Sequence, residues 1–532
     1  MLSEISKSQK IFVMLGVMSA MLLAALDQTI VATAMPRIVQ ELAGLEHLSW
    51  VFTAYLLAST VVVPISGKLS DIYGRKLFYI VSIVIFLIGS ILCGAAQNMT
   101  QLIIFRGIQG IGGGAIMTNS FTIIGDLFPP SERGKWQGML GGVFALSSIV
   151  GPMLGGWLTD NASWRWAFFI NMPVGALALI LIYSLMPKFV SLVKDKVIDY
   201  KGSIALTIGL TTLLLGLVWG GSEYAWNSTQ IVLLFLTSVV SLIVFGLIEK
   251  KAKEPILPLS LFRNSIFSVA VFIIFLVGIA MFGIILYVPL FAQLVLGISA
   301  TNSGTILTPL MLGLIFSSVI TGQVVSRTGR YKLLTIIGLG IIPISLFLLS
   351  QMNSSTTQFE LILKIIFAGI GVGITMPIFT IVVQNAFDHS KLGVVTASTQ
   401  LFRSIGGTVG VAVMGSILNK SLSSKLDLLS EEKFIQTLSR FSPNFSAENI
   451  DVNKLQGILS KDNQTQLAGS ISNLPTLIRV DVMQALSEFG TKIKEILAIS
   501  IGEVFLIVSL LMIVAFIGGF FLKEIPLRKS HH

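Results

Sequence analysis

The sequence contains few charged residues. Asp, Glu, Lys and Arg make up 12% of the 532 residues, whereas soluble globular proteins carry roughly 25%. At the same time 54% of the residues are apolar, and the mean hydropathy is +0.87. Such a chain cannot cover itself with polar surface. This excludes cytosolic enzymes, secreted enzymes and free nucleic-acid-binding proteins, and it predicts a protein dissolved in lipid.

Cysteine and histidine are nearly absent. The single cysteine, Cys93, excludes an internal disulfide framework and a multi-cysteine metal site. The four histidines, His47, His389, His531 and His532, form no metal-ligand pattern. The sequence also contains no Walker loop, HExxH motif or convincing pair of nucleophile and base. We therefore expect no metal, no cofactor and no enzymatic activity.

Long apolar runs are what the sequence does contain. At roughly 20 residues per membrane crossing, they predict an all-α polytopic membrane protein with about fourteen transmembrane helices. The expected spans are 11–34, 49–67, 77–96, 101–124, 136–159, 166–186, 202–220, 229–248, 266–292, 303–325, 333–350, 359–383, 393–418 and 496–522. The first run is too long for the core of a signal peptide, so we expect it to be a spanning helix.

Basic residues are unevenly distributed among the loops between these spans. The chain has 36 Lys and Arg against 26 Asp and Glu, a net charge of +10. With the N-terminus inside, the inner loops and tails hold about 22 basic residues and the short outer loops about two, Arg37 and Arg165. We therefore expect both termini in the cytoplasm of a bacterial cell, in its cell membrane, with the positive charge facing anionic lipid rather than nucleic acid.

The segment 419–495 is polar and falls on the outer side. Apolar residues at Leu486, Phe489 and Ile493 recur at three- or four-residue spacing, which favours short amphipathic helices that form a hairpin against the outer face. A flexible spacer is the alternative interpretation, because loops of this length are either functional or disordered.

A short motif occurs twice, each time in an inner loop. Residues 67–76 contain Gly67, Gly74 and Arg75, and residues 322–330 repeat the same glycine spacing followed by Arg330. Parallel repeats of this kind build many secondary transporters. We therefore predict two six-helix bundles, residues 1–190 and 261–532, with two inserted helices in residues 191–260.

Five motifs, taken together and in order, carry a resemblance to a known family. They are the segments 26–36, 67–76, 106–112, 151–156 and 164–173. At these depths they resemble the signatures of the major facilitator superfamily, specifically of its fourteen-span drug:proton antiporter branch. The resemblance covers nearly all of the chain except 419–495, and it implies the major facilitator fold.

The resemblance implies that residues 67–76 form a charged latch that holds the two bundles together on the inner side. The residues expected to take part in this inner-loop gating are Gly67, Asp71, Gly74, Arg75, Lys76 and Arg133. We name Arg133 as a potential partner for Asp71. Simple positive-inside anchoring accounts for Arg75 and Lys76 but not for Asp71. Because the second copy has Ser326 in place of Asp71, we expect the latch to be asymmetric.

The fifth span carries the motif that resembles the antiporter signature, with Gly151, Pro152, Gly155 and Gly156. Together with Gly138 and Gly142, these glycines are spaced so that small residues gather on one face of a helix. Small residues let two helices approach closely. In the family this contact is associated with the direction of efflux, although ordinary tight packing predicts the same contact.

Charged residues inside the predicted spans are the strongest functional signal. A charge at the middle of a span costs roughly 2.5–3.5 kcal/mol on insertion scales, so it is usually paired or functional. Asp27 in the first span and Arg106 in the fourth lie at similar depths, and we expect them to pair. Two interpretations stay open: Asp27 exchanges a proton whose affinity Arg106 sets, or the two form a permanent structural ion pair.

Three further residues are assigned by the same argument. We place Gln109, one turn from Arg106, with the proton-coupling or substrate site, and Glu503 as a second proton or cation site. Arg403 matches a pattern common in the branch, and we expect it to brace the C-terminal bundle. Glu223 lies among aromatic residues typical of a membrane interface.

The resemblance implies a proton-coupled antiporter that exports lipophilic cationic drugs or toxic compounds by alternating access. Cargo entering from inside would displace a proton from Asp27. The expected partners are small lipophilic substrates, protons and membrane lipid, and a monomer is favoured. One alternative is an exporter or flippase of a lipid or native metabolite on the same scaffold. Another is a non-transporting sensor that recognises a partner through 419–495.

Overall fold

A computed structural model describes residues 6–42, 48–187, 197–221, 223–298, 306–426 and 476–527. Within these ranges the fold is helical and contains no β-strand. The helices are α1 (Lys7–Leu42), α2 (Leu48–Tyr73), α3 (Arg75–Ala95), α4 (Met99–Leu127), α5 (Pro130–Asn161), α6 (Trp166–Phe169), α7 (Asn171–Leu185), α8 (Tyr200–Trp219), α9 (Thr229–Glu249), α10 (Ser265–Leu294), α12 (Leu307–Thr328), α13 (Lys332–Ser350), α14 (Gln358–Asn385), α15 (Leu392–Leu426) and α19 (Thr476–Phe520).

Thirteen of the described helices are long and apolar enough to cross a membrane. The fourteenth predicted span, 101–124, corresponds to α4, which is 29 residues long. This helix is rich in glycine and polar residues, among them Gly112, Asn119 and Thr122, and these are buried against its neighbours. Neighbouring helices shield α4, so its sequence does not need to be strongly apolar.

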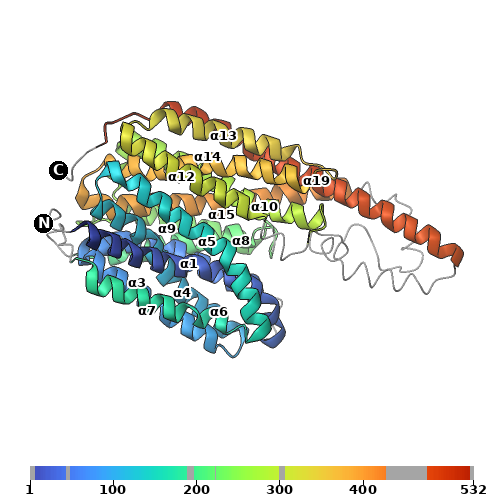
Figure 1. Cartoon of the computed structure of the whole chain (residues 1–532), viewed down its shortest axis with the longest axis horizontal. Coiled ribbons are helices and arrows are strands. Elements are labelled where there is room, and N and C mark those ends of the chain that lie inside the picture. Colours follow the sequence, from blue (N-terminus) through green and yellow to red (C-terminus); the bar gives the residue numbers. More distant parts are fainter. Residues whose placement is uncertain are drawn as a thin grey trace.

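The helices lie roughly side by side in one elongated bundle (Figure 1). The helices α1 to α7 pack against one another as one half, and α10 to α19 as the other. The start of α1 and the end of α19 lie at the same end of the bundle (Figure 1). We call this the near end and the opposite one the far end.

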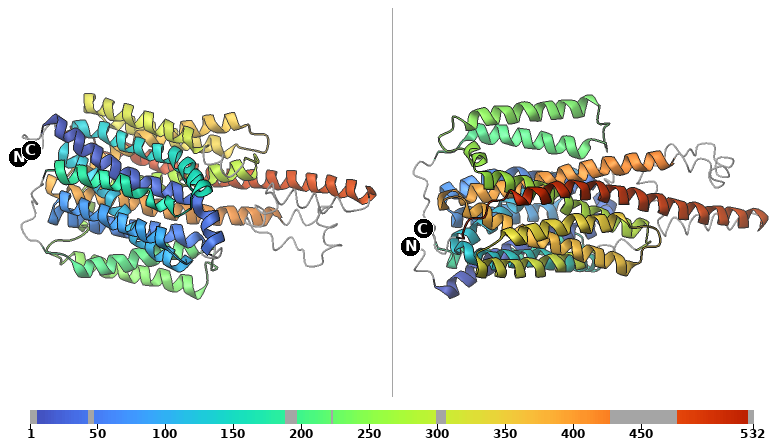
Figure 2. Two further views of the ribbon diagram at one scale, coloured as in Figure 1. Left: turned by 60° about the horizontal axis from the view of Figure 1, so that its bottom comes forward. Right: turned by 90° about the horizontal axis from the view of Figure 1, so that it is seen from above.

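The pair α8 and α9 lies beside the two halves, as the right-hand view of Figure 2 shows. Helix α8 contacts α2 and α15, one helix from each half. The segment after α9 is attached to α2 by an ion pair of 2.5 Å between Lys68 Nζ and Glu254 Oε2. The predicted domain boundary near residue 190 lies outside the described residues.

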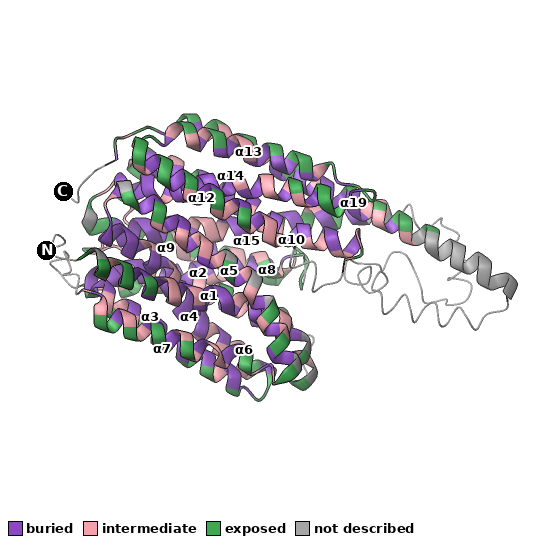
Figure 3. Ribbon diagram, in the orientation of Figure 1, coloured by how far each residue is buried: buried purple, intermediate pink, exposed green. Residues whose placement is uncertain are grey.

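Apolar side chains cover the outward-facing sides of the helices, where Figure 3 shows exposed residues. On α3 these include Leu77, Val84, Ile88 and Ile91, which share one face of the helix. Exposed apolar surface of this extent is unusual for a water-soluble monomer. It is the surface that a lipid-embedded bundle presents to hydrocarbon, because helices satisfy their backbone hydrogen bonds internally.

Helix α19 differs from the sequence-based prediction. It has 45 residues, about 68 Å at 1.5 Å per residue, whereas a hydrocarbon core is about 30 Å thick. Residues 476–495, predicted as part of a hairpin against the outer face, instead continue the last span and project from the far end (Figures 1 and 2). The prediction of short separate helices is therefore wrong for these residues, while residues 427–475 lie outside the described part.

Candidate functional site

The loop between α2 and α3 holds a buried charge cluster at the near end. Arg75 forms ion pairs with Asp71 and, at 2.7 Å from Nε to Oδ2, with Asp126 of α4. Its Nη1 also donates to Ser70 Oγ at 2.5 Å. Gly74 has a φ of 90°, which disfavours any residue with a Cβ. This glycine makes the sharp turn from α2 into α3 that brings Arg75 back over Asp71.

Contacts from this cluster connect the two halves of the molecule. The backbone N–H of Val394 in α15 donates to Asp71 Oδ2 at 3.2 Å. A second contact comes from Arg133, whose Nη1 donates to Gln384 Oε1 of α14 at 3.3 Å. Arg133 also donates to the backbone carbonyls of Gly125 and Phe128. Asp71 and Arg133, two of the predicted latch residues, thus lie where the halves meet, together with Gln384.

Another predicted latch residue, Lys76, is the second residue of α3. Its Nζ lies 5.7 Å from the centre of the Tyr183 ring, a cation–π geometry. Tyr183 belongs to α7, so this contact stays within the N-terminal half. Gln384 was not predicted, although a polar residue inside the apolar run of α14 was the available signal.

Glycines allow two helix crossings at the same end. A Cβ built at Gly67 of α2 would lie 2.5 Å from Ala397 Cβ of α15, and one at Gly134 of α5 would lie 2.5 Å from Gly322 Cα of α12. Gly67 and Gly322 open the two copies of the repeated motif. In both copies the second glycine is left-handed, with φ of 90° at Gly74 and 67° at Gly329. The repeat therefore has a structural meaning: each copy provides one crossing between halves and one turn.

The glycines of α5 do not share a single face, contrary to the sequence-based prediction. Gly138 packs on Val319 of α12, in the other half, whereas Gly151 and Gly155 pack on α1. A Cβ at Gly151 would overlap Thr29 Oγ1, which itself donates to Ser147 O at 3.0 Å. The antiporter-like motif thus presses α5 against α1 close to Asp27. Pro152 belongs to α5, but its side chain is not among those described.

We expect Gly151→Ala to destabilise the protein and Gly156→Ala to be tolerated. At Gly151 the added methyl overlaps Thr29, whereas at Gly156 nothing lies within 4 Å. Overpacking costs about 1–3 kcal/mol, while Gly to Ala in an open helical position stabilises by about 1 kcal/mol. Thermal unfolding of the two purified variants in detergent measures the difference. Equal melting temperatures would contradict the close α1–α5 contact.

The second cluster is built around Asp27, in the interior of the N-terminal half. Arg106 Nη1 donates to Asp27 Oδ2 at 2.5 Å, and Gln109 Nε2 donates to Asp27 Oδ1 at 2.7 Å. Arg106 and Gln109 also bond to each other at 2.8 Å. Asn171 Nδ2 of α7 reaches Asp27 Oδ1 at 3.3 Å. Asp27 is 0% exposed and Arg106 1%, so the structure brings the three sequence-predicted residues together in a dry site.

Tyr55 and Asn171 belong to this cluster but were not predicted. The guanidinium carbon of Arg106 lies 4.3 Å from the centre of the Tyr55 ring, and the Tyr55 hydroxyl donates to the backbone carbonyl of Ala24 in α1 at 3.5 Å. Asn171 falls inside the motif 164–173, and a polar residue at the start of a span was the signal for it. The rotation of α7 that turns it toward Asp27 cannot be read from the sequence.

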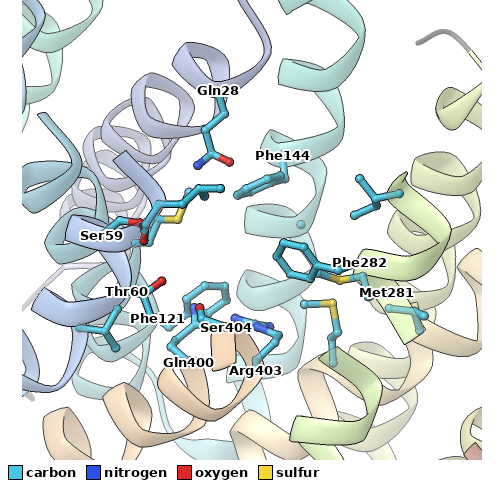
Figure 4. Close-up of a pocket in the computed structure, with 18 of the residues that line it drawn as sticks. Gln28, Ser59, Thr60, Phe121, Phe144, Met281, Phe282, Gln400, Arg403 and Ser404 are labelled. Atoms are coloured by element: carbon cyan, nitrogen blue, oxygen red, sulfur yellow. Dashed lines mark hydrogen bonds between the residues drawn. The ribbon is translucent and has the colours of Figure 1, made fainter. Parts of the chain in front are cut away.

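A central cavity of about 250 Å³ lies between the halves. Ligand sites in proteins typically span roughly 300–1,000 Å³, so it approaches the size of a small-molecule site. Its lining comes from α1, α2, α4 and α5 of one half and α10, α12, α14 and α15 of the other (Figure 4). Five methionines and three phenylalanines are among its 25 lining residues, and such side chains adapt to varied apolar ligands. The described lining includes Gln28 but not Asp27, so the carboxylate lies behind the cavity wall.

The two predicted charges of the C-terminal half lie in different places. Arg403, expected to brace the bundle, extends from α15 into the cavity (Figure 4). Glu503 accepts from Lys425 Nζ at 2.7 Å and from Ser421 Oγ at 2.6 Å, which joins α19 to the far-end part of α15. Glu223 is exposed next to Tyr224, whose ring stacks edge-on against Trp219. In the described ranges no group of three His, Cys, Asp or Glu is placed to hold a metal ion.

Comparison with known proteins accounts for this arrangement of two halves around a cavity. Residues 17–411 match the Major Facilitator Superfamily. The chain belongs to the Major Facilitator Superfamily. It is 40% identical to the multidrug transporter protein MdtP of Bacillus subtilis over 95% of this chain and 94% of that protein. It is 42% identical to multidrug resistance protein 3 of the same organism, over 78% and 81% of the respective lengths.

Solved structures with low sequence identity share the fold. The human organic anion transporter MFSD10 superposes with a TM-score of 0.58 at 15% identity, covering 77% of this chain and 93% of its own. The proton:xylose symporter XylE superposes with a TM-score of 0.54 at 15% identity, covering 85% and 94%. The chain is therefore a multi-pass membrane transporter with the major facilitator fold, and the two Bacillus relatives are a multidrug transporter protein and a multidrug resistance protein by name.

Proposed function

We propose that this superfamily member is a proton-coupled antiporter that exports lipophilic small molecules from the cytoplasm across a cell membrane. The observation that carries the proposal is the buried Asp27 with its three polar partners, next in sequence to the cavity-lining Gln28. The names of the two Bacillus relatives support export of drugs. In this proposal the near end, with its basic loops, faces the cytoplasm.

In the proposed mechanism the proton and the cargo act from opposite sides of α1. When Asp27 is ionised, it holds α1 to α4 through Arg106 and Gln109, and to α7 through Asn171. Protonation removes the charge that holds the Arg106 guanidinium, which weakens these contacts. Because Gln28 follows Asp27 in α1 and lies on the cavity wall, a shift of α1 changes the cavity. This differs from direct displacement of the proton by cargo, since Asp27 is shielded from the cavity.

The proton gradient supplies enough energy for useful export. One charge that crosses 100 mV releases about 2.3 kcal/mol, which corresponds to a roughly fiftyfold concentration ratio. The near-end contacts of Asp71 and Arg133 hold the halves together in this structure. Alternating access requires that they open while the far end closes.

The proposal is tested with inverted membrane vesicles from cells that express the chain and from cells that do not. We expect uptake of the neutral dye Nile red or the fluorescent anion pyrenebutyrate when the vesicle interior is acidified, and loss of uptake when nigericin removes the pH gradient. Addition of a transported dye should also dissipate part of a preformed gradient. Uptake that does not depend on the gradient would contradict proton coupling. No uptake of any dye would contradict drug export.

A further inference from the structure

The charge of the central cavity is that of a single basic residue. Its polar lining groups are mainly amides and hydroxyls, from Gln28, Ser59, Thr60, Gln400 and others, and the lining that the structure describes contains no carboxylate. Arg403 is the only charged side chain in that lining. A permanent cation placed in this cavity would therefore meet a positive charge and no negative one.

Arg403 differs from the buried arginines of the N-terminal half. Arg75 pairs with Asp71 and Asp126, and Arg106 pairs with Asp27. Arg133 donates to two backbone carbonyls and to Gln384. For Arg403, by contrast, no hydrogen bond, ion pair or ring contact to any described residue is found. An arginine inside a membrane bundle is usually paired or functional, and this one is unpaired.

Close packing of the backbone holds Arg403 in place. Helices α15 and α10 touch at this level, because a Cβ on Gly278 would lie 2.5 Å from the Arg403 carbonyl oxygen and one on Gly406 would overlap Phe275 O. This contact fixes the backbone of α15 at Arg403 against α10. The side chain extends from it into the space between the halves, alongside Gln400 and Ser404 (Figure 4).

We propose that Arg403 binds the anionic group of the cargo, a carboxylate, sulfonate or phosphate carried on a lipophilic body. The planar guanidinium offers paired N–H donors that match the two oxygens of such a group. The methionine and phenylalanine side chains of the lining accommodate the apolar body. The expected cargo is thus an amphipathic anion or zwitterion rather than the cation expected from the sequence. The inference rests on the proposed function, because it takes the central cavity as the route of export.

The first test compares three probes that share one aromatic body: pyrenebutyrate, its neutral methyl ester and pyrenebutyl-trimethylammonium. Binding to the purified wild-type chain in detergent needs neither a gradient nor transport. We expect the anion to bind at least tenfold more tightly than the cation. Equal affinity, or tighter binding of the cation, would overturn the proposal even if the vesicles show proton-coupled export. Anion preference without gradient-driven uptake would instead leave the Arg403 site standing and contradict the proposed function.

Variants assign the preference to the side chain. We expect Arg403→Met to lower affinity for pyrenebutyrate at least tenfold and to change affinity for the methyl ester less than twofold. Arg403→Lys keeps the positive charge but lacks the paired N–H donors of the guanidinium, so it should retain part of the preference for the anion. Arg263→Met, the same change at an exposed arginine before α10, is the matched control. An equal loss for all three probes in Arg403→Met would overturn the proposal, because it would indicate a structural role.

A last experiment distinguishes two sources of such an anion, a soluble amphipathic molecule and the headgroup of a lipid. Proteoliposomes that contain fluorescently labelled phosphatidylglycerol or phosphatidylcholine report lipid movement across the bilayer, and pyrenebutyrate reports a soluble cargo. Arg403-dependent transport of pyrenebutyrate supports a soluble amphipathic anion. Arg403-dependent movement of phosphatidylglycerol alone supports the headgroup of a lipid. Movement of neither would contradict the proposed function, and movement that Arg403→Met does not change would overturn the Arg403 proposal.

Discussion

Asp27→Asn is expected to abolish accumulation driven by a pH gradient. The amide cannot exchange a proton, so the roughly fiftyfold ratio that one proton per cycle supports at 100 mV should fall to about one. Exchange of labelled for unlabelled cargo without a gradient should persist, because the cavity lining does not include Asp27. Vesicle uptake and exchange, measured side by side, separate the loss of coupling from the loss of transport.

The substitution also leaves Arg106 without its carboxylate partner. Removing one member of a buried pair costs about 3–5 kcal/mol, so the yield of folded protein must be checked by size-exclusion chromatography and probe binding. Glu132→Gln, the same change at an exposed position in the first turn of α5, is the control and should behave like the wild type. Gradient-driven accumulation by folded Asp27→Asn would mean that the pair is a permanent structural contact.

Gly322→Ala is expected to open the near end and to slow transport about tenfold or more. The added methyl would overlap the carbonyl of Gly134. At this point the backbone of α12 is in direct contact with the backbone of α5. Neither helix has a flexible side chain there that could move aside. Overpacking of this kind costs about 1–3 kcal/mol, which shifts an open–closed equilibrium roughly 5- to 150-fold.

Opening is measured with a reporter cysteine in the cavity, Thr118→Cys, and a membrane-impermeant maleimide added on the near-end side. The native Cys93 is 0% exposed, so it contributes little background. Gly142→Ala is the control within the same helix pair, since its methyl would lie 3.8 Å from Ile315, at ordinary contact distance. Similar labelling of Gly322→Ala and Gly142→Ala would show that the α5–α12 crossing does not control access.

Part of this architecture can be predicted from the sequence, because few structures are possible for an apolar chain inside a membrane. Apolar runs of this length must become helices, and the predicted span 266–292, for example, is α10 (Ser265–Leu294). A carboxylate and a guanidinium at similar depth in two such helices are each costly to bury alone. The pairing of Asp27 with Arg106 could therefore be predicted from the sequence. The helix boundary at Gly74 likewise follows from the need for a residue that tolerates a positive φ.

Other features depend on helix rotation, which hydropathy does not determine. Gly138 and Gly151 were expected on one contact face, but α5 crosses two different partners along its length. Arg403 was expected to brace the C-terminal bundle, and its position in the cavity lining was not predicted. The sequence does not say whether a charged side chain in the middle of a span turns toward a neighbouring helix or toward a cavity. The start of α19 at Thr476 was missed because residues 476–495 are polar, and the hydropathy signal ends where the span leaves the lipid.

The unbroken course of α19 has a mechanical consequence. About twenty of its residues extend beyond the part that packs in the bundle, a rod of about 30 Å at 1.5 Å per residue. A tilt of about 10° at the base would swing the tip through about 5 Å on that geometry. A small rearrangement between the two halves of the molecule therefore produces a larger displacement at the tip of α19, which a spectroscopic label can detect. A fluorophore at the start of α19, near Thr476, would report the motion of the C-terminal half.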